Sequence, residues 1–319
     1  MQQRVPIRNK TRPVHVKIIF VLAGLICLTT FVSGPVALIG GFLCSHFIGN
    51  PFRHYNNRII NWLLKIAVVG LGFGMNILEV TNLGREGFSL TVISIFSTLL
   101  IGFFIGKFLN VHKQITHLIS SGTAICGGSA IAAISSVINS SEKDISVSLG
   151  VVFLLNAMAL VIFPPIGHLF DLTEYQFGLW TAIAIHDTSS VVGASLAYGE
   201  EALQIATTVK LVRALWIVPL SLVSIFIFRG KIRGIKIPWF IFLFIGAILL
   251  NSYFPLPNHL TVSVTDISKS VLTLTLFLIG AGLPIDKIRS AGWRSMLLGI
   301  SLWVFISISS LCLIIGVLK

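Results

Sequence analysis

Charged residues are scarce in this sequence of 319 residues: only 11% are Asp, Glu, Lys or Arg, whereas a soluble domain carries about 25%. Cysteines are also few, and no two of them form a CxxC pair, so we expect neither a disulfide framework nor a metal site. The four cysteines are Cys27, Cys44, Cys126 and Cys312. The sequence has no GxxxxGK[ST] loop, which argues against a pump driven by ATP. The low content of charged residues is unusual for a soluble protein, and the missing motifs exclude several common enzyme and metal-binding classes.

Long apolar stretches are what the sequence has in their place. Hydrophobic residues make up 55% of it, and the mean hydropathy is +0.94. A membrane span needs about 20 mainly apolar residues. The candidate spans are 16–32, 35–49, 59–78, 88–108, 115–138, 145–170, 176–197, 203–228, 237–253, 270–283 and 296–318. We therefore expect an all-α integral membrane protein with about eleven transmembrane helices, forming one domain over residues 1–319.

Basic residues outnumber acidic ones, and the net charge is +12. They fall in short segments between the apolar stretches, as in membrane proteins whose positive loops stay in the cytoplasm, so we expect no nucleic-acid partner. With the basic N-terminus (1–15) in the cytoplasm, the C-terminus lies outside. The exceptions to the pattern are Arg85, Lys143, Lys269 and Lys319 on the outer side, and Lys65, Lys210 and Arg213 within spans.

The fifth candidate span holds a cluster of small residues between Gly122 and Ala130. Glycine costs a helix interior about 1 kcal/mol relative to alanine, and backbone groups freed in lipid need partners. The cluster predicts a discontinuous helix whose free N–H groups bind an anion; close helix packing is the alternative. The candidate substrate-binding residues here are Gly122, Thr123, Cys126, Gly127, Gly128 and Ser129.

Five consecutive polar residues, His186 to Ser190, lie inside the seventh span. Such a run is costly in a membrane unless it faces protein or water. A histidine titrates near neutral pH, and Asp187 could hold or relay a proton. We interpret the run as an ion-coupling site, with a satisfied polar network that only fixes packing as the alternative. Its candidate residues are His186, Asp187, Ser189 and Ser190.

Lys210 and Arg213 lie on one face of the eighth span, because their spacing is i, i+3. Cations at this depth need counter-charges or an anion, and Arg213 can grip two oxygens at once. We assign both to substrate binding. An ion pair with Asp187 and a Lys210 side chain that reaches the membrane interface remain alternatives.

Two short stretches, 71–78 and 279–286, resemble each other, each with a Gly-x-Gly near the end of a span. Our topology places them at opposite faces of the membrane. Inverted repeats of this kind are typical of secondary transporters.

Taken together, these motifs resemble the YeiH-type family of bacterial membrane proteins, often labelled sulfate exporters. The resemblance covers nearly the whole chain and rests on residues 122–133, His186-Asp187, 210–213 with Pro219, 237–240 and 280–283. Some relatives have His-Glu in place of His186-Asp187. The family is grouped with bile-acid symporters and cation–proton antiporters. It implies the bacterial plasma membrane, an inverted-repeat secondary-transporter fold with two discontinuous crossing helices, and an elevator-like or rocking motion. The first crossing helix would be the fifth span, and its mate either the tenth or the seventh.

The leading hypothesis is a secondary transporter, not an enzyme, for a small anion such as sulfate or a sulfonate, with export as the family-based direction. The partners would be the anion, H⁺ or Na⁺ as coupling ion, the lipid bilayer and in one possible assembly a second copy, with no cofactor. One alternative is an intramembrane serine hydrolase, because Gly127-Gly128-Ser129-Ala130 nearly matches Gly-x-Ser-Gly and His186 could act as base. Another is a membrane scaffold.

Overall fold

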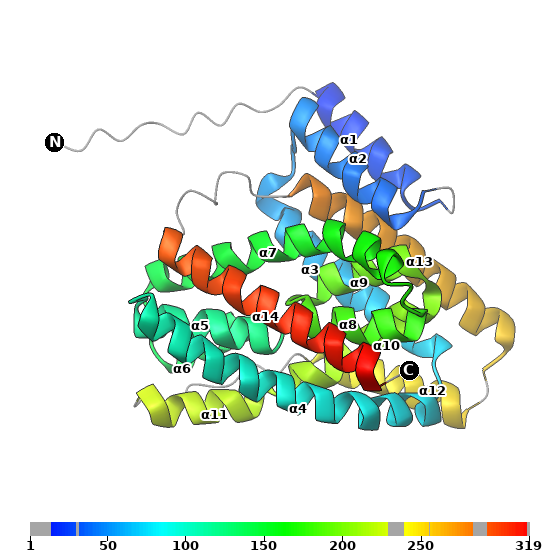
Figure 1. Cartoon of the computed structure of the whole chain (residues 1–319). Coiled ribbons are helices and arrows are strands. Elements are labelled where there is room, and N and C mark those ends of the chain that lie inside the picture. Colours follow the sequence, from blue (N-terminus) through cyan, green and yellow to red (C-terminus); the bar gives the residue numbers. More distant parts are fainter. Residues whose placement is uncertain (1–13, 30–31, 229–238, 255, 283–291, 318–319) are drawn as a thin grey trace.

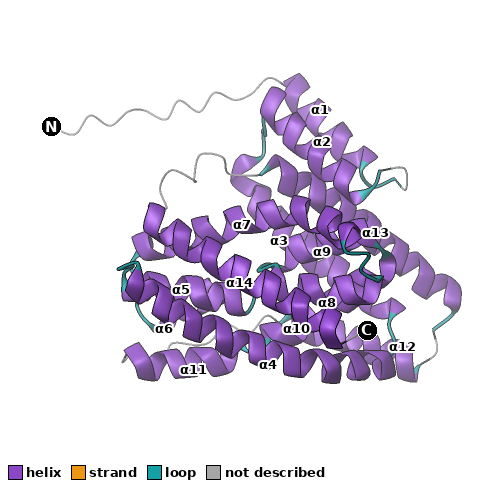
Figure 2. Ribbon diagram, viewed as in Figure 1, coloured by secondary structure: helices purple, strands orange, loops and turns teal. Residues whose placement is uncertain are grey.

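The computed structural model describes residues 14–29, 32–228, 239–254, 256–282 and 292–317, and in these residues it contains helices and no strand (Figures 1 and 2). Most of the basic N-terminal segment lies outside this range. The helices are α1 (Val14–Ile26), α2 (Gly34–Phe47), α3 (Arg53–Leu71), the 3-10 turn η1 (Gly72–Gly74), α4 (Ile77–Phe108), α5 (Lys113–Ala124), α6 (Gly128–Val137), α7 (Glu142–Leu169), α8 (Glu174–Ala184), α9 (Thr188–Tyr198), α10 (Glu200–Ala214), α11 (Ile217–Phe228), α12 (Phe240–Tyr253), α13 (Asn258–Ala281) and α14 (Trp293–Val317).

Five stretches are long and apolar enough to cross a membrane: Phe88–Phe108, Glu142–Leu169, Glu200–Phe228, Asn258–Ala281 and Trp293–Gly316. Several of these helices expose large apolar side chains. On α4, for example, Phe96, Leu100, Phe103 and Phe104 are each about 60% exposed, which suits a surface in contact with lipid and would be unusual in water. The class of an all-helical membrane protein is therefore confirmed.

The helices pack in two groups. α4 to α11 and α14 contact one another and form the main bundle, while α1, α2, α3, α12 and α13 form the flanking bundle. In the flanking bundle α2 and α13 touch backbone to backbone: a Cβ at Gly41 would overlap the Phe277 carbonyl oxygen, and one at Gly280 would overlap that of Leu38. Such small-residue contacts are how helices approach closely in lipid. Between the bundles, α9 contacts α2 and α13.

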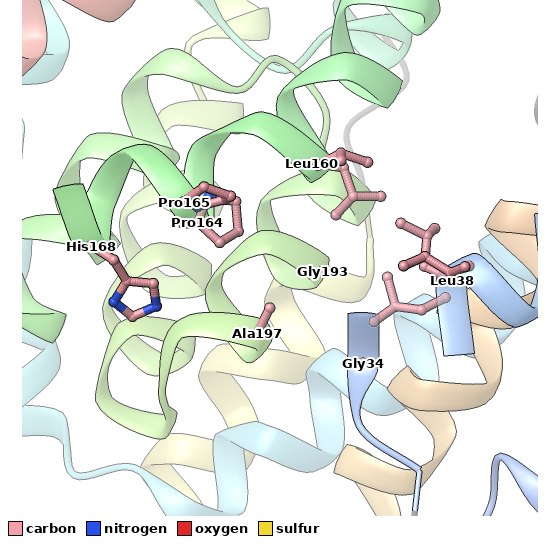
Figure 3. A pocket seen from close by; sticks show the side chains of 11 residues that line it. Gly34, Leu38, Leu160, Pro164, Pro165, His168, Gly193 and Ala197 are labelled. Carbon is pink, nitrogen blue, oxygen red and sulfur yellow. The ribbon is translucent and has the colours of Figure 1, made fainter. Parts of the chain in front are cut away.

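A cavity of about 480 Å³ lies at this boundary between the bundles (Figure 3). Its lining comes from α2, α7, α9 and α13 and is almost wholly apolar. It includes Leu38, Leu160, Pro164, Gly193 and Leu276. The cavity interrupts the contact between the bundles locally, while buried side chains of both, such as Leu38 and Leu160, still share one hydrophobic core.

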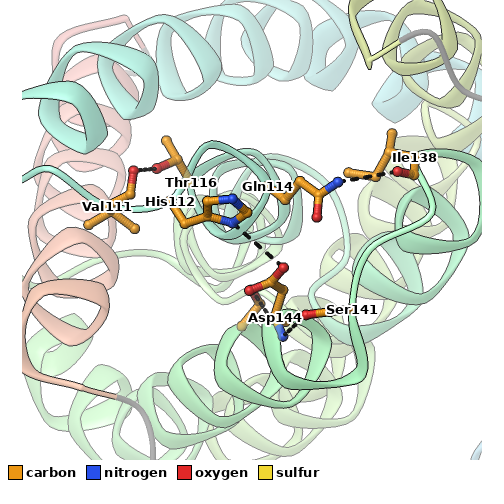
Figure 4. Close-up of polar contacts among 8 residues, drawn as sticks. Val111, His112, Gln114, Thr116, Ile138, Ser141 and Asp144 are labelled. Carbon is orange, nitrogen blue, oxygen red and sulfur yellow. Dashed lines mark hydrogen bonds and ion pairs between the residues drawn. The ribbon is translucent and has the colours of Figure 1, made fainter.

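The predicted fifth span is a helical hairpin that doubles back, formed by α5 and α6 and called hairpin 1 here. The side-chain amide of Gln114, at the start of α5, donates to the carbonyl of Ile138, just after α6, at 3.4 Å (Figure 4). Farther in, a Cβ at Gly122 would lie 3.0 Å from the Ile131 side chain. In one straight helix these residues would be far apart, since each residue advances the axis by 1.5 Å.

The predicted seventh span is a second hairpin, formed by α8 and α9 and called hairpin 2. The Glu174 carboxylate, at the start of α8, accepts from the Glu201 N–H at 2.9 Å. The rings of Phe177 and Tyr198 stack with centroids 3.7 Å apart. Deeper in the hairpin, the Thr181 and Ser195 hydroxyls lie 2.9 Å apart. Hairpin 2 thus begins and ends at the same level.

α7 shows that the hairpins open at opposite ends of the main bundle. His112 precedes hairpin 1 and lies 3.6 Å from Asp144 in the first turn of α7 (Figure 4). Tyr198 of hairpin 2 stacks on His168 in the last turn of α7, at 4.4 Å. Halfway along α7, Asn156 accepts from the His186 backbone N–H at the tip of hairpin 2, at 3.0 Å. The tips therefore meet near the middle of the bundle.

The structure corrects the predicted topology. Helix breaks are present in the fifth and seventh candidate spans, but the chain turns back at each of them, so neither is a crossing helix and the count of about eleven spans is too high. Hydropathy cannot distinguish one long span from two short apolar helices joined by a turn. The tenth span is not a discontinuous mate, because α13 is continuous from Asn258 to Ala281. In the noted repeat, 72–74 is a 3-10 turn, whereas its counterpart 280–282 is the end and C-cap of the continuous helix α13; residues 283–286 lie outside the described residues.

Cysteine labelling tests this topology directly. In a chain without its native cysteines, Lys113→Cys and Lys143→Cys should react with a membrane-impermeant maleimide from the same side, because both exposed positions lie at the open end of hairpin 1. Asp171→Cys, beyond α7, should react from the opposite side. Labelling of positions 113 and 143 from opposite sides would restore a crossing span and contradict the hairpin.

Candidate functional site

The two hairpin tips are built alike. α5 ends at a C-cap Ile125 and α8 at a C-cap Ile185; α6 begins at an N-cap Gly127 and α9 at an N-cap Asp187. One residue separates cap from cap in each tip, Cys126 in the first and His186 in the second. The tips touch, since a Cβ at Gly127 would lie 3.3 Å from the Asp187 backbone nitrogen and 3.3 Å from its Cβ.

The N-terminus of α9 is occupied by a carboxylate of its own chain. Asp187 Oδ1 accepts from the Ser190 N–H at 3.0 Å, and Oδ2 accepts from the Ser189 hydroxyl at 2.7 Å. A carboxylate at this position satisfies free N–H groups and the partial positive charge of the helix end. The predicted ion-coupling residues Asp187, Ser189 and Ser190 therefore act together as a helix cap.

The N-terminus of α6 has no such group. Gly127, the equivalent N-cap, has φ +62° and ψ −122° and offers no side chain to the N–H groups that follow. Ser129, in the first turn of α6, is exposed, and Gly128 is partly exposed. The Cys126 thiol lies within hydrogen-bonding reach of the Ala130 N–H and the Ser129 hydroxyl. This helix end is thus a positively polarised group of N–H donors that no carboxylate caps.

The C-termini of α5 and α8 are held by Arg213 and Lys210, both fully buried on α10. Arg213 Nε donates to the Ala124 carbonyl at 2.7 Å, and its Nη1 donates to the Ile183 carbonyl at 3.2 Å. Cations favour the partial negative charge of helix C-termini. Arg213 thereby ties hairpin 1 to hairpin 2.

The hydrogen bonds of Lys210 to described residues all go to hairpin 2. Its Nζ donates to the Ile185 carbonyl at 2.7 Å and to the Ala182 carbonyl at 3.2 Å. Its full burial excludes a side chain that reaches the membrane interface. No salt bridge joins Lys210 or Arg213 to Asp187 among the residues that the structure describes, so the ion-pair alternative is wrong as well.

Several fully buried polar atoms around the tips have no hydrogen-bond partner within the described part of the chain. They are Arg213 Nη2, both ring nitrogens of His186, Thr123 Oγ1 and Asn156 Nδ2. Buried polar groups normally find partners, because an unpaired one costs about 1–3 kcal/mol. These five atoms surround the two tips and mark the place where they meet as a candidate site for a polar ligand. A serine hydrolase would need a hydrogen bond between His186 and Ser129, and the described residues show none.

The structure brings the predicted site residues together from three separate spans. Ten of the twelve lie at the tips or in the first turn after them, or bind their carbonyls: Cys126, Gly127, Gly128, Ser129, His186, Asp187, Ser189, Ser190, Lys210 and Arg213. Thr123 lies just before the first tip. Gly122 packs against Ile131, so its small size serves the hairpin's own packing. Asn156 was not among the predicted site residues, yet its side chain accepts from the His186 N–H of the second tip at 3.0 Å.

Comparisons with known proteins agree with this architecture in class. The family described as Conserved hypothetical protein 698 matches residues 21–299. A UPF0324 membrane protein of Bacteroides thetaiotaomicron is 50% identical over 297 residues, which are 92% of this chain and 89% of that relative. A UPF0324 membrane protein of Porphyromonas gingivalis is 51% identical over 294 residues, 90% of this chain and 88% of the relative. No solved structure matches the chain. The chain therefore belongs to the family described as Conserved hypothetical protein 698, and the relatives matched here carry the name UPF0324 membrane protein.

Proposed function

We propose that the protein is a secondary transporter of a small anion, which binds where the two hairpin tips meet. The observation that carries this proposal is the difference between the two tips. In hairpin 2 the carboxylate of Asp187 occupies the start of α9, and in hairpin 1 the equivalent Gly127 leaves the start of α6 without an anion. An anion from outside would supply to α6 what Asp187 supplies to α9.

The charges around the tips favour the same passenger. Lys210 and Arg213 can bring two positive charges to the tips, against one negative charge on Asp187. A buried excess of positive charge is costly unless an anion compensates it. Residues predicted to contact the anion directly play two parts in the proposal. Gly128 and Ser129 offer donors to it, and Gly127, whose own N–H donates to the Gly122 carbonyl at 2.8 Å, leaves room for it by having no side chain. Arg213 faces it with Nη2, which has no partner among the described residues.

An inverted repeat is part of the proposal. Each unit would consist of a hairpin followed by a spanning helix: hairpin 1 with α7, and hairpin 2 with α10 and α11. The Ala-Ile pairs at 124–125 and 184–185 occupy the same place in each tip. Since hairpin 1 and hairpin 2 open at opposite ends of α7, the two units would face opposite sides of the membrane, as in many secondary transporters.

The orientation follows from the basic residues. With hairpin 1 open to the cytoplasm, Lys143 joins Lys113 on the cytoplasmic side, which strengthens the excess of positive charge there. We place the protein in the bacterial plasma membrane with its C-terminus outside. The two bundles, with the apolar cavity between them, would move against each other by the elevator-like or rocking motion that the resemblance to YeiH-type sulfate exporters implies.

A ligand screen tests the function. Sulfate, sulfite, thiosulfate and methanesulfonate are added to the detergent-purified chain, and thermal unfolding is followed. A ligand at 100 times its Kd adds about 2.7 kcal/mol to the stability of the folded state, so at least one anion should raise the unfolding temperature while the neutral analogue dimethyl sulfone does not. The stabilising anion should then cross liposome membranes that contain the protein. Stabilisation by no anion, or equal stabilisation by the neutral analogue, would refute an anion site.

A further inference from the structure

Lys210 and Arg213 place two ionisable cationic side chains one helical turn apart on α10, behind the hairpin tips. Both side chains are 0% exposed, and both donate to carbonyls in the last residues of hairpin 2 before its turn: Ile183 for Arg213, and Ala182 and Ile185 for Lys210. Transfer of a single unpaired ion into a protein interior costs several kcal/mol even after relaxation. Two protonated cations with one carboxylate nearby are therefore unfavourable while no anion is bound.

Only one of the two cations can lose its charge. The guanidinium of Arg213 stays protonated in proteins, whereas a buried lysine readily becomes neutral. The hydrogen bonds of Lys210 fit the neutral form. Its Nζ makes two hydrogen bonds to described residues, to the Ile185 and Ala182 carbonyls, and a neutral amine has two N–H groups. An ammonium has a third N–H group, for which these two carbonyls provide no acceptor.

The other titratable groups around Lys210 are less suited to carry the proton. They are Cys126, His186, Asp187 and the permanently charged Arg213. Asp187 uses both carboxylate oxygens to cap α9, and protonation would weaken that cap. Cys126 is a thiol, which is neutral when protonated and so adds no positive charge for an anion. A protonated His186 would put a third cation next to Lys210 and Arg213.

We propose that Lys210 couples the anion to a proton: its amine is neutral while the tips are empty and takes up one proton when the anion binds. The inference rests on the proposed function. The step balances as amine, proton and anion giving an ammonium–anion pair, with no bond to carbon broken. The third N–H of the ammonium then has the anion as its acceptor. Anion and proton would cross the membrane together, and the expected role of His186 and Asp187 as coupling residues would pass to Lys210.

Calorimetric titration tests the proton count. The anions of the screen, sulfate, sulfite, thiosulfate and methanesulfonate, are titrated into the purified full chain in buffers of different ionisation enthalpy. The dependence of the measured heat on the buffer gives the protons taken up per anion. The wild type should take up about one, and its Kd should rise about tenfold per pH unit in the range where the amine is neutral. Lys210→Arg keeps a permanent positive charge, so its uptake should fall to nearly zero and its Kd should become independent of pH.

Two further variants keep the test decisive. Lys143→Arg, at an exposed lysine on α7, should keep the uptake of the wild type. His186→Gln should still take up one proton per anion, whatever its affinity, and it answers the question even if Lys210→Arg does not fold. Anion binding without proton uptake in the wild type, or uptake lost in His186→Gln, would overturn the assignment to Lys210 and leave the anion site standing. Failure of every anion to bind would overturn the proposed function itself.

Discussion

Arg213→Ala is expected to abolish anion transport and to lower the free energy of unfolding by about 3–5 kcal/mol, the usual cost of removing one member of a buried charged contact. The substitution removes the donors to the Ala124 and Ile183 carbonyls. The first carbonyl ends α5 and the second lies in the last turn of α8, and each would lose a charged donor at a buried position. The measurements are uptake of the stabilising anion by proteoliposomes and the denaturation midpoint of the purified chain.

Arg294→Ala is the matched control for this prediction. Arg294 is exposed near the start of α14, with its guanidinium 5.6 Å from the ring of Trp293. Surface substitutions of this kind change stability by less than about 0.5 kcal/mol, so uptake and midpoint should match the wild type. Unchanged flux in Arg213→Ala at an equal level of folded protein would show that Arg213 is not part of the transport site.

Gly127→Ala is expected to destabilise the protein by about 1–3 kcal/mol, the range for a residue held in a sparsely populated backbone conformation. At φ +62° and ψ −122° an L-amino acid is strained. The added Cβ would also lie 3.3 Å from Asp187 and from the Val152 side chain, so the two tips would have to move apart. Because a change of about 1.4 kcal/mol is tenfold in affinity, we expect anion binding to weaken at least about tenfold.

Gly246→Ala provides the comparison, because Gly246 lies inside α12 and a Cβ there would meet nothing within 4 Å. Alanine in a helix interior should be neutral or slightly stabilising. Thermal unfolding and anion titration of the two variants separate strain at the tip from any general effect of adding a methyl group. Wild-type affinity and stability in Gly127→Ala would show that the tip can rearrange freely and does not shape the site.

The sequence predicted the residues of the candidate site better than the path of the chain. Glycines, hydroxyls and charges inside apolar stretches are costly in a membrane wherever they occur, so Gly127, His186 and Arg213 stood out without a structure. Their convergence could be suspected, because polar groups in lipid need one another. The hydrogen-bond acceptors of Arg213 and Lys210 could not be predicted. They are backbone carbonyls, which every residue has and no sequence pattern marks.

The hairpins escaped prediction for a physical reason. α5 with α6, and α8 with α9, are together as long and as apolar as one spanning helix, and hydropathy measures length and composition only. The signs of a return were local. Asp187 followed by two serines is an N-cap signature, and Gly127-Gly128 permits a sharp turn. Each of these is also found in helices that cross with a kink, so the two paths could be separated only by contacts such as Gln114 with Ile138.

The account depends on an anion occupying the start of α6, and protection of Ser129 measures that most directly. Ser129 is exposed in the first turn of α6. In a chain without native cysteines, Ser129→Cys is treated with a small thiol reagent, with and without the stabilising anion. The predicted result is labelling that slows as the anion concentration passes its Kd and that does not slow with dimethyl sulfone. An anion that binds and leaves the labelling rate at position 129 unchanged would contradict the account.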